Sequence, residues 1–198
     1  MIHFHPPAFR PRERLSPATI GICSLQHNAG TTCLSFACAN YLCSKLNQPT
    51  ALVERNGTHA FRRLHPGKGE HFKSYGIDFY PDAGEFSCSD LSHTWRLFDY
   101  GVITDTHMAE FLRCDRRLVL LDLSPWNREL TEELFERAFG SGRNKEQITL
   151  LGNPAPTGRL SSSSVFYGRD ILTIPYLPNP FHLTPDDFGV FEKIFKGV

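Results

Sequence analysis

The chain has 198 residues, of which 40% are hydrophobic, and this is enough apolar material for one sizeable core. It carries 21 Lys and Arg against 21 Asp and Glu, so its zero formal charge excludes a generally basic nucleic-acid coat and a strongly acidic tail. The charge is uneven, because residues 1–68 hold eight Lys and Arg against two Asp and Glu. Any electrostatic binding site must therefore be local.

The sequence carries no targeting signal and favours a cytoplasmic protein without a transmembrane segment. No run of 18 apolar residues occurs, and the first residues lack the basic and then apolar order of a secretory signal. Six cysteines form no C-x-x-C pair, and four of them lie inside apolar segments, so we expect small buried thiols. Nine histidines are scattered, which argues against a metal centre.

The beginning of the chain divides into a leader and a first strand, loop and helix. Residues 1–17 contain four prolines and three arginines without apolar periodicity, which predicts a flexible leader ahead of a single domain at 18–198. Residues 19–24 are an apolar run, and the segment 31–46 has helical apolar spacing. A second strand is expected at 49–54.

The rest of the chain alternates between short apolar runs and helical patterns, after a polar and basic stretch at 55–73. Strands are expected at 76–81, 98–105, 117–122, 147–151 and 170–174, and helices at 126–139 and 185–195. Apolar runs separated by helices predict an α/β fold, with a mostly parallel central sheet and helices on both faces. The loop Leu25–Gly30, Asp105 and the loop Gly152–Pro156 would then open onto one edge of that sheet.

Three segments together suggest a family. They are IGICSLQHNAGTTCLS at 20–35, FDYGVITD at 98–105 and LLGNP at 150–154. The first resembles the opening of the MinD/ParA-like P-loop ATPases, the second resembles their strand with the magnesium-side acid, and the third resembles the strand before their base-binding loop. The resemblance extends over about residues 18–196 and implies a three-layer P-loop NTPase-like fold.

The phosphate loop departs from the family pattern at the positions that carry charge. Gly30 and Thr32 match the glycine and the magnesium-binding hydroxyl of the family. Thr31, however, stands at the position of the P-loop lysine, and Gln26 stands at the position of the additional signature lysine. Asn56 replaces the acid that helps to position the attacking water. Because phosphoryl transfer depends on positioned charge, we expect a degenerate member that has lost hydrolysis.

The resemblance implies a weak nucleotide site, in which Mg²⁺ would lie at Thr32 and Asp105 if a nucleotide binds. The site would comprise Gln26, Asn28, Gly30, Thr31, Thr32, Cys33, Asp105 and Asn153. Simpler interpretations stay open: Thr31 or Thr32 closes the first helical turn, Asp105 caps a helix, and Asn153 lies in an ordinary turn. ATP or ADP with Mg²⁺ and no cofactor at all are both compatible with the sequence.

The basic stretch gives a second candidate site, for an acidic protein, an anionic membrane surface or a nucleic-acid backbone, although a solvated loop is the alternative. Its members are Arg55, Arg62, Arg63, Lys68 and Lys73. Three functional hypotheses follow. The first is a scaffold or positioning subunit that acts through protein contacts. The second is a divergent ATPase that forms a nucleotide-dependent homodimer and borrows the missing charge from an arginine, such as Arg55 or one donated by a second subunit. The third is a DNA- or membrane-surface-binding accessory protein.

Overall fold

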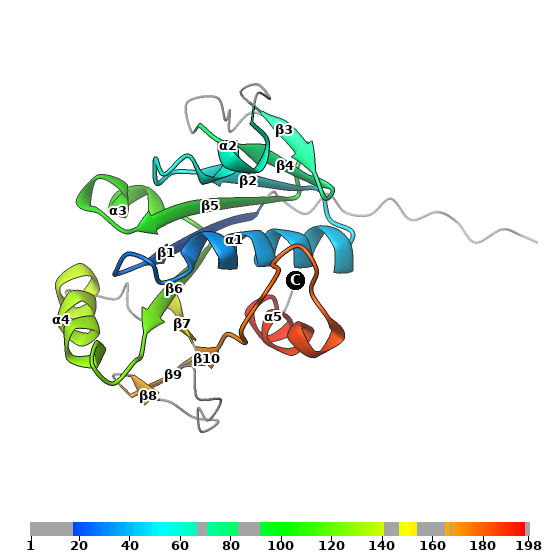
Figure 1. Cartoon of the computed structure of the whole chain (residues 1–198). Coiled ribbons are helices and arrows are strands. Elements are labelled where there is room, and N and C mark those ends of the chain that lie inside the picture. The colour runs from blue at the N-terminus through cyan, green and yellow to red at the C-terminus, as the bar shows by residue number, and fades with distance from the viewer. Residues whose placement is uncertain are drawn as a thin grey trace, which may run out of the picture.

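A computed structural model describes residues 18–66, 71–82, 92–140, 147–153, 165–166 and 168–196 (Figure 1). The predicted leader, residues 1–17, lies outside this description. The main sheet contains β1 (Ala18–Ser24), β2 (Thr50–Glu54), β3 (Phe72–Ser74), β4 (Ile77–Tyr80), β5 (Trp95–Val102), β6 (Arg116–Asp122), β7 (Ile148–Asn153) and β10 (Leu172–Thr173). A small second sheet pairs β8 (Val165–Phe166) with β9 (Arg169–Asp170).

The described helices connect these strands in an α/β order. They are α1 (Thr31–Asn40), a π-helical turn (Tyr41–Lys45), α2 (Ala60–Leu64), α3 (Asp105–Phe111), α4 (Arg128–Phe139), a 3-10 turn (Pro185–Asp187) and α5 (Phe188–Ile194). Among the described residues, no helix is long and apolar enough to cross a bilayer.

The main sheet has the order β10-β7-β6-β1-β5-β2-β4-β3. Its strand pairs are parallel except for β3 and β4, which form an antiparallel hairpin at one edge. Apolar runs such as Leu118–Leu121 are buried because both faces of the sheet are covered. This arrangement confirms the predicted mostly parallel three-layer fold.

Two apolar clusters lie on opposite faces of the sheet and build the layers seen in Figure 1. One cluster contains Phe36 of α1, Phe61 of α2 and Phe191 of α5. The other contains Phe111 of α3 and Phe135 of α4. The helices α1, α2 and α5 therefore cover one face, and α3 and α4 cover the other.

Several element boundaries differ from those expected from the sequence. The helix predicted at 31–46 changes to π-helical geometry after Asn40, and the strand predicted at 98–105 lies at Trp95–Val102 instead. The strand predicted at 170–174 is divided between β9 and β10. The polar stretch 55–73 contains α2 and begins β3, which its composition did not indicate.

A bulge in β5 shapes the edge of the sheet where the phosphate loop begins. Ile22 pairs with Asp99 and Cys23 pairs with Gly101, so Tyr100 is an extra residue between them. Gly101 has φ +59, a left-handed conformation that suits glycine. The bulge turns the end of β5 toward the segment that follows β2.

Replacing Gly101 with alanine is expected to lower the free energy of unfolding by about 2 kcal/mol. The new Cβ would adopt an unfavourable φ and would lie 2.7 Å from the Asn56 Cβ. Denaturant titration measures the loss, and Gly57→Ala is the matched control, because Gly57 also has positive φ but has nothing within 4 Å of its built Cβ. Equal losses in the two variants would show that the close approach to Asn56 carries no cost.

Candidate functional site

A cleft of about 430 Å³ lies at the carboxyl end of β1 and β5, beside the first turn of α1. Parallel sheets bind their ligands at such edges. The cleft contains no Lys, Arg, Asp or Glu among its lining residues. These are Ser24, Gln26, His27, Asn28, Ala29, Gly30, Thr31, Thr32, Cys33, Asn56, Thr58, Tyr100, Gly101, Val102, Thr104 and His107.

The loop between β1 and α1 keeps the geometry of a helix-opening loop. Asn28 and Gly30 both have positive φ, 62° and 94°. Gly30 is the N-cap residue of α1, and its carbonyl oxygen accepts the N–H of Leu34 at 3.0 Å. Since the N-cap residue is a glycine, no side chain of the cap closes the first turn. Thr31 and Thr32 follow the cap and do not act as the N-cap residue. Both threonines line the cleft instead.

Asp99 of β5 is a fully buried carboxyl group behind this cleft, and sequence reasoning missed it. Its Oδ1 accepts the N–H of Gly101 at 3.0 Å, whereas Oδ2 has no hydrogen-bond partner by distance and angle. Burial raises the pKa of Asp99 to about 6, although the Thr32 hydroxyl, the Gly101 N–H and the Asn56 amide lower it. An acidic residue inside an apolar strand was the signal that could have identified it.

The structure therefore brings Asp99, and not Asp105, to Thr32. Asp105 is exposed, opens α3 and does not line the cleft. The difference arises because β5 ends at Val102, so that Thr104 becomes the N-cap residue of α3 and Asp105 lies in its first turn. A carboxylate there interacts favourably with the helix dipole without forming a cap hydrogen bond.

Two side-chain amides fix the loop, that of Gln26 from the cleft lining and that of Asn153 from the end of β7. The Gln26 amide donates to Oγ1 of Thr131 in α4 at 2.9 Å, and that hydroxyl donates to the carbonyl of Asp122 at 2.8 Å. The Asn153 amide donates to the carbonyl of Ala29 at 2.9 Å. Asn153 ends β7, and the remainder of the predicted loop 152–156 lies outside the described residues. Both amides are thus engaged in holding the loop.

Arg55, the candidate for a borrowed charge, is engaged by neighbouring residues outside the cleft lining. Its guanidinium group forms an ion pair with Glu110 of α3 and lies 5.9 Å from the centre of the Phe98 ring. Arg55 does not line the cleft. The cleft therefore receives no cationic side chain from this segment.

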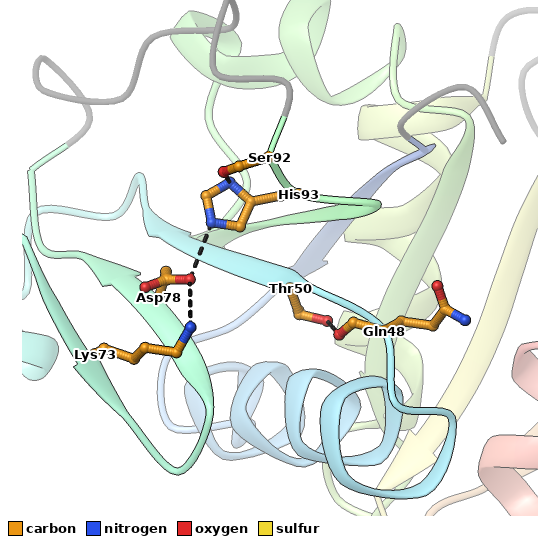
Figure 2. Close-up of polar contacts among 6 residues, drawn as sticks. All are labelled: Gln48, Thr50, Lys73, Asp78, Ser92 and His93. Carbon is orange, nitrogen blue, oxygen red and sulfur yellow. Dashed lines mark hydrogen bonds and ion pairs between the residues drawn. The ribbon is translucent and has the colours of Figure 1, made fainter. Parts of the chain in front are cut away.

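The predicted basic stretch is not a single patch. Arg62 and Arg63 are exposed on α2, whereas Lys73 of β3 forms an ion pair with Asp78 of β4 at 3.3 Å. Figure 2 shows that Asp78 is also within hydrogen-bond distance of His93 Nε2, at 3.1 Å. Lys68 lies outside the described residues. Arg62 and Arg63 are consecutive in α2, and the Arg63 guanidinium donates to the Thr58 carbonyl oxygen at 2.8 Å.

No family model and no curated protein matches the sequence. The structure is similar to a plasmid partition protein of Borrelia burgdorferi B31 bound to AMPPNP, with a TM-score of 0.60 and 14% identity over 90% of this chain and 96% of that chain. A ParA family ATPase of Chlorobium tepidum has a TM-score of 0.51 and 12% sequence identity, over 72% of this chain and 76% of that chain. The MinC:MinD complex of Aquifex aeolicus has a TM-score of 0.50 and 14% sequence identity, over 70% of this chain and 69% of that chain. At this level of identity the comparisons establish the fold alone, and the chain has the three-layer α/β fold of the ParA- and MinD-type ATPases.

Proposed function

We propose that this chain is a degenerate P-loop protein that does not hydrolyse ATP and serves as a scaffold or positioning subunit through protein contacts. One observation supports the proposal above the others. The cleft at the start of α1 has no Lys or Arg among its lining residues. The threonine at position 31 occupies the place of the P-loop lysine in the family resemblance.

The chemistry of phosphoryl transfer explains why this loss matters. The reaction depends on positioning and on positive charge near the transferred phosphoryl group, and one key cation can contribute a factor of about 10³ or more to the rate. The Thr31 hydroxyl donates a hydrogen bond but carries no charge. Arg55 is already paired with Glu110, so it does not replace the missing lysine.

The residues present fit a nucleotide only in part. The N–H groups of the first turn of α1 and the hydroxyls of Thr31 and Thr32 are suitable donors for phosphate oxygens. The oxygen atoms of Thr32 and Asp99 are of the type that Mg²⁺ prefers. Because no cation balances the phosphate charge, we expect nucleotide binding to be weak.

A calorimetric titration with ATP and ADP in the presence of Mg²⁺ tests this proposal. The wild type is expected to bind with Kd above about 1 mM, and Thr31→Lys is expected to tighten binding about tenfold or more. The control is Thr104→Lys, which places the same charge on the cleft lining at an exposed position, whereas Thr31 is buried. The wild type should release phosphate from ATP no faster than Asp99→Asn does. Phosphate release by the wild type that Asp99→Asn abolishes would overturn the proposal.

A second candidate is a divergent ATPase that dimerises with nucleotide, and the AMPPNP bound to the Borrelia burgdorferi relative favours it. Since Arg55 is engaged by Glu110, the missing charge would have to come from a second copy of the chain. Light scattering with AMPPNP and Mg²⁺ separates the candidates. A dimer that forms only with nucleotide supports the ATPase, and an unchanged mass supports the scaffold.

A further inference from the structure

Two apolar surface patches lie outside the cleft. The hairpin patch consists of Leu64, Tyr75 and a hollow of about 120 Å³ between them, which is also lined by His65, Ser74, Phe79 and Phe181. The helix patch consists of Trp126, in the turn that precedes α4, and Leu130, in the first turn of α4. Trp126 is 77% exposed and Tyr75 is 54% exposed.

The two patches have opposite charge. Leu64 of the hairpin patch directly follows the exposed Arg62 and Arg63 in α2, and none of the residues lining the hollow is acidic. The Arg63 guanidinium donates a hydrogen bond to the Thr58 carbonyl oxygen at 2.8 Å, an acceptor that does not neutralise its positive charge. The helix patch is adjacent to the exposed Glu129 and Glu133 of α4. In the same helix, Arg128 forms an ion pair with Glu132, so it does not offset those two carboxylates.

Tyr75 is held in place at a cost in backbone energy. It has φ 50° and Gly76 has φ 78°, so the hairpin turn has two left-handed residues, a geometry that favours Asn-Gly. The tyrosine ring is stacked on Phe181, with centroids 4.4 Å apart and planes at 17°. A ring that is already immobilised loses little entropy on binding, which is typical of a contact residue.

We propose that the helix patch of one copy docks on the hairpin patch of a second copy, in a head-to-tail contact. Each patch supplies what the other lacks: Trp126 and Leu130 with acidic neighbours on one side, and an apolar hollow with basic neighbours on the other. Tryptophan is enriched among residues that dominate interface energies. Pairing of two helix patches would instead oppose like charges.

The position of the patches in the fold makes the contact intermolecular. The hairpin patch lies at the β3 edge of the sheet, on the side of α1, whereas α4 covers the opposite face (Figure 1). A single copy therefore presents both patches at once. Such a heterologous contact builds chains of subunits rather than a closed pair. It does not involve the cleft, so it is independent of whether nucleotide binds.

The average mass in solution tests the contact, measured by light scattering up to about 200 µM protein. For the wild type it should rise with concentration past that of a dimer, and it should fall at high salt because the charged neighbours are screened. Trp126→Ser and Tyr75→Asn should each weaken association about 30-fold or more. Asparagine suits the turn at position 75, so this variant removes the ring without straining the fold.

Mixing the two variants identifies which surfaces meet. Trp126→Ser keeps the hairpin patch and Tyr75→Asn keeps the helix patch, so an equal mixture should form a dimer and stop there. Tyr176→Ser is the control, because Tyr176 is 82% exposed but belongs to neither patch, and it should assemble as the wild type does. A monomeric wild type, a single variant that still assembles, or a mixture that stays monomeric would each overturn the proposal.

Discussion

Replacing Glu54 with alanine is expected to lower the free energy of unfolding by about 2–4 kcal/mol. Glu54 ends β2 and is buried. Its carboxylate accepts the N–H groups of Ala60 and Phe61, both at 3.0 Å, and the hydroxyl of Thr58 at 2.9 Å. The substitution would leave the first N–H groups of α2 without acceptors, and the N–H of Phe61 is buried.

Denaturant titration of Glu54→Ala beside Thr58→Ala separates the helix cap from the hydroxyl contact. Thr58→Ala removes one exposed hydroxyl donor and keeps both N–H contacts, so its loss should be under about 1 kcal/mol. Glu54→Gln should lie between the two, because an amide oxygen still accepts but carries no charge. If Glu54→Ala were no more destabilising than Thr58→Ala, the capping of α2 by this side chain would be disproved.

The α/β order was predictable because it follows from local patterns. Uninterrupted apolar runs at 19–24 and 117–122, with a helical pattern after the first, indicate buried parallel strands, and the structure has β1, β6 and α1 there. The resemblance to the MinD/ParA-like class likewise rests on the order of such segments. The similarity in fold to ParA- and MinD-type ATPases supports it.

No comparable local pattern exists where a contact between separate segments determines the structure. The helix α2 is only five residues long, and its own composition resembles that of a loop. It depends on the Glu54 carboxylate, which lies outside the helix and accepts its first N–H groups. The end of β5 depends on the bulge at Tyr100, which moves Asp105 out of the strand and leaves Asp99 beside Thr32. A bulge shifts every later side chain by one position, and periodicity alone does not reveal it.

Three polar side chains near the cleft are bound to the protein itself. The Gln26 amide is used by Thr131, the Asn153 amide by Ala29 and the Arg55 guanidinium by Glu110. Each of these donors would have to leave a protein partner before it could contact a phosphate, and that exchange gains little. The loop thus resembles a phosphate loop in shape, while the Gln26 and Asn153 amides hold it to the rest of the fold.

The largest stabilisation that we expect from one substitution comes from Asp99→Asn, at about 3 kcal/mol near pH 7. Burial raises the pKa of Asp99 from its ordinary value of 3.8 to about 6. Between about pH 4 and pH 6 the folded chain therefore holds a proton that the unfolded chain has lost. The contribution of Asp99 to the free energy of unfolding is fully present below about pH 4 and is lost as the pH rises through about 6. Asparagine does not titrate and keeps an oxygen for the N–H of Gly101.

The difference in unfolding free energy between Asp99→Asn and the wild type, measured from pH 4 to pH 7.5, isolates this group from the others that titrate. It should rise with pH and level off above about pH 7, because the wild-type carboxylate is then charged in both states. Asp105→Asn is the matched control for the loss of one carboxylate, since Asp105 is exposed whereas Asp99 is buried. A difference that is constant with pH, or that falls as the pH rises, would show that the Asp99 carboxylate has a stabilising partner when charged. In that case the charged Asp99 would contribute to a functional cleft, and the loss of chemistry proposed for this loop would have to be reconsidered.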